Sequence, residues 1–140
     1  MSLQENKAVV LRFIDEVQNQ HHLDAIDELF SPDFVDHSGM TASPYIQGTK
    51  ELFIGTFTAF PDFRIEVHQQ LAEGDCVMTR KTVHGTHLGP FMGMPATGKE
   101  IAVTFVDIFT VIDGKITDHW TENAALGIMQ QLGFFLLPAT

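Results

Sequence analysis

The hydrophobic period of this chain changes between residues 60 and 63, and this change restricts the fold more than any other feature. Before it, apolar residues recur every three or four positions, which is the spacing of one helical face. After it, Phe63, Ile65 and Val67 alternate with polar residues, as in a half-buried strand. Helices followed by long strands and tight turns predict the α+β class.

The first half is expected to be helical. Residues 4–20 predict an amphipathic helix, and residues 23–30 predict a second, shorter one that Ser31-Pro32 ends. We expect these two helices to pack as a hairpin. An extended piece at residues 34–37 and a further helix over residues 49–60 complete this half.

The second half is expected to form antiparallel strands. Asp113-Gly114 is typical of a two-residue hairpin turn, and it separates strands predicted at 101–112 and 115–121. The remaining predicted elements are strands at 63–69 and 76–86, a loop at 88–98, a helix at 124–132 ended by Gly133, and an apolar tail, Phe134–Leu137, that would serve as an interface or a pocket lid.

Length and composition favour one domain over residues 1–140. A chain of 140 residues buries roughly 68% of the surface that its unfolded form exposes, which suffices for a core and a small cavity. Twelve Phe residues suit either a plain core or a pocket for an apolar ligand. We expect a curved antiparallel sheet, packed with the helical hairpin and further helices, to form a cone with one open end.

The charge balance restricts the partners. There are 18 acidic against 8 basic side chains, with no Lys/Arg run, which argues against nucleic acid or anionic membrane. Cys76 is the single cysteine, so an internal disulfide is impossible and a reducing compartment is indicated. Without an apolar run of about 20 residues, a cytoplasmic location is the simplest expectation.

Several kinds of chemistry lack their usual motifs. Seven His residues invite a metal interpretation, but no helical His-x-x-x-His or Cys/His spacing occurs, so no metal is expected. No Ser stands in a Gly-x-Ser-x-Gly turn, and Cys76 follows Asp75, which disfavours a thiolate. Phosphate-binding and dinucleotide-binding glycine patterns are absent as well.

Five segments occur in an order and spacing typical of one family. The most specific is Gly85-Thr86-His87-Leu88-Gly89-Pro90-Phe91-Met92-Gly93-Met94-Pro95-Ala96-Thr97-Gly98-Lys99. The others are Asp36-His37, Phe60-Pro61-Asp62-Phe63, Asp113-Gly114-Lys115-Ile116-Thr117-Asp118-His119-Trp120 and Gln130-Gln131-Leu132-Gly133. With these segments the chain resembles the SnoaL-like polyketide cyclases over nearly its whole length.

The resemblance implies a cone-shaped fold of the nuclear-transport-factor superfamily, usually a homodimer packed through the sheet. It implies ring closure of an aromatic polyketide by intramolecular aldol condensation, with acid–base residues and no metal or other cofactor. Ketosteroid isomerase, limonene epoxide hydrolase and scytalone dehydratase share the fold, so the fold alone leaves the reaction open. Two positions depart from the family: Ala124 stands where an Asp is common, and Thr110 where many members have Arg.

Asp107 is the first catalytic candidate from strand alternation. Its side chain is expected on the same face as Phe105 and Phe109. Burial among apolar groups would raise its pKa, which suits an acid or base near neutrality. Arg80 would either neutralise Asp107 or hold a substrate carboxylate or enolate. The alternatives are a structural ion pair between the two and an outward-facing arginine.

Three histidines are further candidates. His37 follows the second helix and is expected at the mouth of the cone, where it could move a proton or satisfy a loop carbonyl. His84 shares strand parity with Arg80 and is its expected partner. His87 lies in the glycine-rich loop, where it would either contact the substrate or fix a turn.

His119 and Trp120 lie on opposite faces of a strand, so only one of them can face the pocket. Trp120 shares its face with Ile116, and it is favoured as the inward residue. Glu122 would then also turn inward, as the carboxylate nearest to the position of the missing Asp. His119 stays a catalytic candidate of lower rank.

These residues support an enzyme and two alternatives. In the enzyme, Asp107 or Glu122 removes an activated C–H proton, and His37, Arg80 or His84 stabilises the enolate of a small apolar carbonyl compound. The alternatives are a hydrophobic-ligand-binding module, which Ala124 favours, and a dimeric scaffold with a filled cone. The residues expected to contact a substrate are His87, Phe53, Phe57, Phe91, Met92, Met94, Phe105 and Trp120.

Overall fold

The computed structural model describes residues 1–122 and 124–134, and it confirms the α+β class. The helical elements are α1 (Leu3–Phe13), η1 (Ile14–Asn19), α2 (Ala25–Leu29), α3 (Ile46–Ala59) and α4 (Ala124–Gln131). The strands are β1 (Phe30–Asp36), β2 (Arg64–Glu73), β3 (Cys76–Thr86), β4 (Glu100–Ile112) and β5 (Lys115–Thr121).

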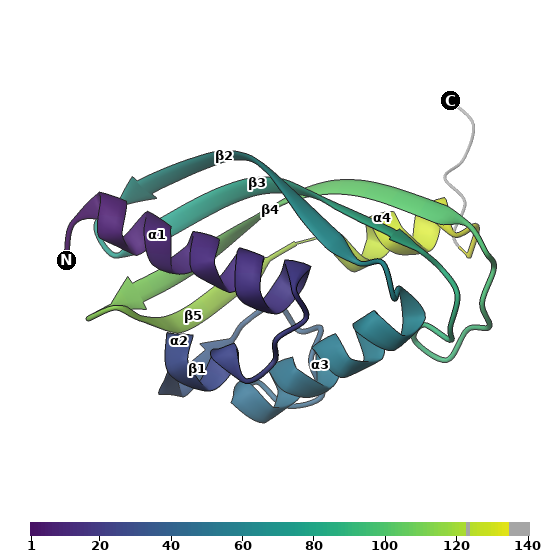
Figure 1. Cartoon of the computed structure of the whole chain (residues 1–140), viewed down its shortest axis with the longest axis horizontal. Helices are drawn as coiled ribbons and strands as arrows, with labels where there is room; N and C mark the ends of the chain where they lie inside the picture. Colours follow the sequence, from purple (N-terminus) through teal and green to yellow (C-terminus); the bar gives the residue numbers. More distant parts are fainter. Residues whose placement is uncertain (123, 135–140) are drawn as a thin grey trace.

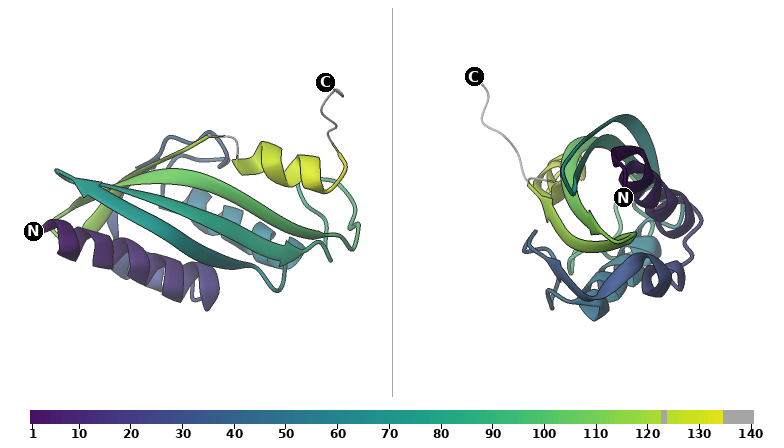
Figure 2. Two further views of the ribbon diagram at one scale, coloured as in Figure 1. Left: turned by 90° about the horizontal axis from the view of Figure 1, so that it is seen from above. Right: turned by 90° about the vertical axis from the view of Figure 1, so that its left-hand side faces the viewer.

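The five strands form one curved sheet in the order β1-β5-β4-β3-β2. All neighbours are antiparallel except β1 and β5, which run parallel. The sheet curls around α1, while α3 lies beside β1 and α4 closes against β4 (Figure 1, Figure 2). This is the cone expected from the sequence, and its concave side holds the core.

The predicted first helix divides into two parts. Ser2 caps α1, and its side chain and that of Glu5 form a reciprocal capping box. From Ile14 the helix widens into the π-helical turn η1, a feature often found at functional sites. The turn leaves Gln18 buried, whereas Asn19 pairs through its side chain with the backbone of Ile65.

The second helix is shorter than predicted. It ends at Leu29, and β1 begins at Phe30 and continues through Pro32. The extended piece predicted at residues 34–37 is therefore the end of a longer strand that includes Pro32. This strand lies at the edge of the sheet, where the missing N–H of a proline is tolerated.

A β-bulge interrupts β5. Val111 pairs with Ile116 and Thr110 pairs with Asp118, so Thr117 is the extra residue. The predicted hairpin turn before it is present, with positive φ at both Asp113 and Gly114. A bulge reverses the alternation of side chains that follow it, and this changes which residues of β5 face inward.

The predicted tail is described only at Phe134, which is half-buried and packs against the core and the ring of His87. Residues 135–137 of that tail lie outside the described residues. Within the described ranges, each helix is too short or too polar to span a bilayer.

Candidate functional site

A cavity of about 350 Å³ lies within the cone. Its wall is mostly apolar, and eight Phe residues from helices, strands and loops line it: Phe13, Phe30, Phe34, Phe53, Phe63, Phe91, Phe105 and Phe109. A cavity of this size holds a small organic molecule. Of the predicted contact residues, Phe53, Phe91, Met92 and Phe105 line it.

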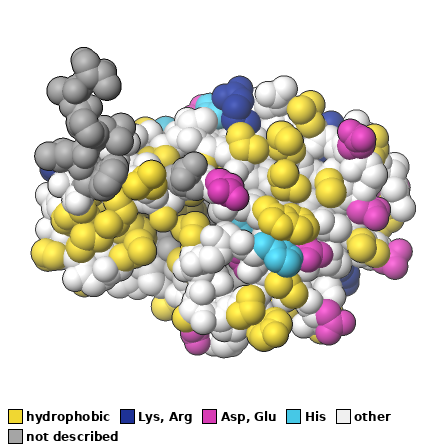
Figure 3. Space-filling model, turned by 180° about the vertical axis from the view of Figure 1, so that it is seen from behind, with side chains coloured by type: hydrophobic (Ala, Val, Ile, Leu, Met, Phe, Trp, Pro, Cys, Tyr) yellow, Lys and Arg dark blue, Asp and Glu magenta, His cyan; other side chains and the backbone are white. Residues whose placement is uncertain are grey.

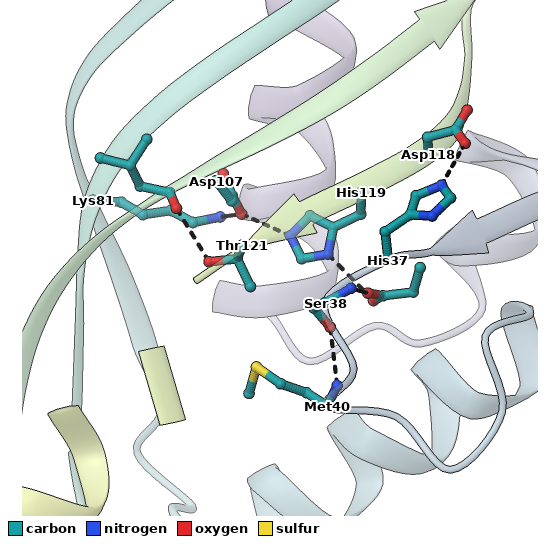
Figure 4. Close-up of polar contacts among 10 residues, drawn as sticks. His37, Ser38, Met40, Lys81, Asp107, Asp118, His119 and Thr121 are labelled. Carbon is teal, nitrogen blue, oxygen red and sulfur yellow. Dashed lines mark hydrogen bonds and ion pairs between the residues drawn. The ribbon is translucent and has the colours of Figure 1, made fainter. Parts of the chain in front are cut away.

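Four charged side chains meet at the cavity wall, and we call them the acid–base cluster: Asp36, Lys81, Asp107 and His119 (Figure 4). Asp36, Asp107 and His119 line the cavity, whereas Lys81 lies behind Asp107. The four come from β1, β3, β4 and β5, so the curvature of the sheet brings them together.

Asp107 is almost completely buried, with 2% of its surface exposed. Its Oδ2 atom lies 2.8 Å from Lys81 Nζ and 3.2 Å from His119 Nε2. Its Oδ1 atom has no hydrogen-bond partner among the described residues. One carboxylate oxygen is therefore held by two side chains, and the other is buried at the cavity wall without a described partner.

The pKa of Asp107 is lowered, contrary to the expectation from its apolar neighbours. Burial raises this pKa, but the charge of Lys81 and the hydrogen bond and charge of His119 outweigh burial. The sequence analysis offered Arg80 as the cation that pairs with Asp107, but the cation in the structure is Lys81. Arg80 is exposed, because it pairs with Val106 on the outer face while Lys81 points inward.

His119 lies between the two carboxylates. Its Nδ1 atom is 3.2 Å from Asp36 Oδ2, and its ring stacks on Phe109 with centroids 4.5 Å apart. Burial lowers the pKa of His119, but the hydrogen bonds and charges of Asp107 and Asp36 raise it above the ordinary value. Burial likewise opposes ionisation of Asp36, yet bonds from His119 and Ser38 lower its pKa. With His119 protonated, the cluster carries two positive and two negative charges.

The inward residue of β5 is His119, so the prediction that favoured Trp120 is wrong. The Thr117 bulge puts His119, not Trp120, on the side of Ile116. Trp120 is 38% exposed, and its ring stacks on that of His37, 4.6 Å away. His37 itself is exposed and pairs with Asp118 at 2.9 Å, so it lies outside the cavity, and its neighbour Asp36 faces inward.

Two other catalytic candidates are also outside the cavity. His84 lies on the outer face of β3, where its Nε2 atom is 3.0 Å from Glu66 Oε1. Glu122 follows the end of β5, is exposed, and does not contribute to the cavity wall. Neither residue contacts the acid–base cluster.

His87 is fully buried beneath the glycine-rich loop and holds that loop together. Thr97 donates its backbone N–H to His87 Nδ1 at 3.1 Å, and the ring packs on Phe60. The structure thus places His87 in the turn-fixing role and not in the cavity wall. Phe57, stacked on His21, and Met94, bridged to Phe91, are likewise absent from that wall.

The sequence interpretation missed several residues of the cavity wall and of the acid–base cluster. Asp36 could have been found, since it shares alternation with the apolar Phe34. Lys81 shares alternation with Val77 and Val83 in the same way. Gln18 and Thr49 also line the cavity, and each has a buried side-chain oxygen without a described partner; the π-turn that buries Gln18 has no clear sequence pattern.

Ala124 lines the cavity at the position where the resemblance implied a carboxylate. The acid–base groups of this chain are therefore on the sheet and not at the start of α4. Among residues 1–122 and 124–134, no three His, Cys, Asp or Glu side chains are placed to hold a metal ion.

Comparisons with known proteins identify the family. Residues 8–132 match the family model described as SnoaL-like polyketide cyclase. The chain is 26% identical to aklanonic acid methyl ester cyclase DnrD of Streptomyces peucetius, an alignment that covers 89% of this chain and 88% of that protein. It is 27% identical to nogalonic acid methyl ester cyclase of Streptomyces nogalater, covering 82% and 88%.

Solved structures show the same fold. AclR from Streptomyces galilaeus, a proposed hydroxylase, superposes with a TM-score of 0.82 at 32% identity, covering 96% of this chain and all of that one. IdmH from Streptomyces antibioticus, a proposed polyketide cyclase, gives 0.78 at 31% identity, covering 91% and 98%. With a family match over most of its length and the predicted cone around an acid–base cluster, this chain belongs to the SnoaL-like polyketide cyclase family.

Proposed function

We propose that this chain closes a ring in a small, mostly apolar carbonyl compound by intramolecular aldol addition, with acid–base residues and no cofactor. The observation that carries the proposal is the buried, unpartnered Oδ1 atom of Asp107. It belongs to a buried carboxylate in the wall of an aromatic cavity, and its partner oxygen is fixed by two cations. A base held in this way is preorganised for proton transfer.

The cyclised product is an isomer of the substrate, and Asp107 ends the reaction in its starting protonation state. Asp107 Oδ1 takes a proton from the carbon between two carbonyl groups, and the resulting enolate attacks a second carbonyl of the same molecule. The new C–C bond leaves an alkoxide, which takes the proton back from Asp107. His119 and Lys81, both cationic, keep Oδ2 in place throughout.

The lowered pKa of Asp107 indicates which substrates suit it. A weak base removes only an acidic proton, so the carbon must be activated, as in a β-keto ester. The named relatives act on methyl esters of polyketide acids. Gln18 and Thr49 offer buried oxygens to substituents of the same substrate.

The experiment is to incubate the wild type with aklanonic acid methyl ester and nogalonic acid methyl ester and to analyse the products by mass spectrometry. A cyclised product has the mass of the substrate, whereas hydroxylation adds one oxygen atom. Asp107→Asn should bind the substrate without converting it. Binding with no turnover by the wild type would instead favour the ligand-binding module that Ala124 suggested.

We further propose that the protein is a cytoplasmic homodimer. Leu71, Met78, Ile108 and Trp120 pair successively across β2, β3, β4 and β5, and they form one apolar row on the outer face of the sheet. Three of them are well exposed, and Figure 3 shows how apolar side chains reach the surface on one face of the molecule. The free thiol of Cys76 is exposed, in keeping with a reducing compartment.

Light scattering of the purified protein tests the homodimer. A dimer mass that Met78→Glu converts to a monomer mass would support it. A monomer mass for the wild type at all concentrations would rule it out.

A further inference from the structure

Lys81 is a cation that the resemblance did not lead us to expect. It points inward from β3 with 0% of its surface exposed, and it does not line the cavity. It therefore has no direct contact with a molecule bound in the cavity.

Asp107 is the anion in direct contact with Lys81. The Nζ atom lies 2.8 Å from Asp107 Oδ2 as an ion pair, and it makes no hydrogen bond of good geometry with any described residue. Its other close neighbours are the rings of Phe105 and Phe109, whose centroids lie 5.5 and 5.6 Å away. Burial of an ammonium group is costly unless it is paired, so its position depends on Asp107.

The pairing decides which oxygen of Asp107 is free. Lys81 from β3 and His119 from β5 both contact Oδ2, and Asp36 from β1 reaches the carboxylate only through His119. We propose that Lys81 is a positioning residue, which holds Asp107 by Oδ2 so that Oδ1 meets the substrate as an ionised base. This inference rests on the proposed function, in which Asp107 is the base.

A direct titration of Asp107 tests the inference without any substrate. The protein is labelled with aspartate carrying ¹³C at the side-chain carboxyl, and the Asp107 signal is identified by its loss in Asp107→Asn. In the wild type, we expect a midpoint below that of an ordinary aspartate, about 3.9. In Lys81→Met the midpoint should rise by about one pH unit or more, because an adjacent cation is removed.

Arg80→Met is the matched control, since it removes a cation from the neighbouring position on the outer face. The control should leave the midpoint where it is. An unchanged midpoint in Lys81→Met, or an equal shift in Arg80→Met, would overturn the inference. If Lys81→Met does not fold, Lys81→Gln replaces it. If neither folds, the wild type decides, because a midpoint at or above about 3.9 contradicts a positioning cation.

Turnover supplies the second readout. Lys81→Met should lower kcat about tenfold or more, with a smaller change in KM, and move the acidic limb of the pH profile upward. A merely structural lysine would lower the melting temperature and leave kcat and that limb unchanged. If the wild type shows no turnover, the proposed function fails, whereas the titration still decides the role of Lys81.

Discussion

Two His–Asp pairs lie where β1 meets β5, and they occupy opposite faces of the sheet. Asp36 at the end of β1 pairs with His119 on the inner face, and His37, the next residue, pairs with Asp118 on the outer face (Figure 4). The inner side chains are 5% and 15% exposed, whereas the outer ones are 31% and 38% exposed.

The difference between the two pairs teaches that the surroundings, not the residue types, give a pair its chemistry. The inner His119 touches a second carboxylate and a Phe ring, and its pKa is raised. The outer pair is in contact with water, which screens its charges and leaves it little free energy to contribute. Adjacent residues in one strand thus have opposite roles, since successive side chains point to opposite faces.

The largest effect is expected on the free energy of unfolding, at the neighbours Lys81 and Arg80. These two residues of β3 also lie on the inner and the outer face of the sheet. Lys81→Met should lower the free energy of unfolding by about 3 kcal/mol, because it breaks a buried ion pair from one side. Arg80→Met should change it by less than about 0.5 kcal/mol. Urea unfolding followed by circular dichroism measures both, and equal losses would contradict the assignment of inner and outer faces.

Turnover should separate the two histidines. His119→Gln should lower kcat about 100-fold, since it removes the cation and hydrogen bond that fix Asp107. His37→Gln should change kcat by less than about twofold, because it lies outside the cavity and contacts Asp118. Initial rates with the ester substrates measure this contrast. A comparable loss in both variants would mean that the outer pair also takes part in catalysis.

A double-mutant cycle should then rank the two pairs by coupling energy. For Asp36 and His119 we expect about 1.5–3 kcal/mol, the range of hydrogen bonds to charged groups. For His37 and Asp118 we expect less than about 1 kcal/mol, as for exposed ion pairs. Each cycle uses Asp→Asn, His→Gln and the double variant in urea unfolding, and a reversed order of the two energies would refute the comparison.

The smallest effect is the pH dependence of stability that His119 imposes. The pKa of His119 is raised in the folded state. Its contribution to the free energy of unfolding is therefore fully present below about pH 6.5 and is lost as the pH rises through the folded pKa. Asp36 and Asp107 have lowered pKa values, so their contributions are complete above about 4 and are lost as the pH falls. Stability should therefore be highest between about pH 4 and 6.5.

His119→Gln is expected to remove the decline of stability above that range, while His37→Gln should keep it. Thermal unfolding at a series of pH values measures the effect. A decline that persists unchanged in His119→Gln would show that another group causes it.

The sequence by itself determined the class of fold, most element positions, the inward direction of Asp107 and part of the cavity wall. The change of hydrophobic period and the Asp113-Gly114 turn are local patterns, and both predicted their elements correctly. The same holds for the inward direction of Asp107, whose neighbours Phe105 and Phe109 share its alternation and line the cavity with it. The family was also evident from the order of its motifs.

Only the tertiary structure decided which histidines, carboxylates and cations meet. The bulge at Thr117 reversed the alternation that favoured Trp120, and nothing in the local sequence marks it. The parallel contact of β1 with β5 joins segments about 80 residues apart, and it decides that Asp36 is inside and His37 outside. On β3, alternation with Val77 and Val83 marks Lys81 as the inward residue, but only the register against β4 brings it to Asp107. Local patterns record periodicity, but the direction of each face is set by long-range packing.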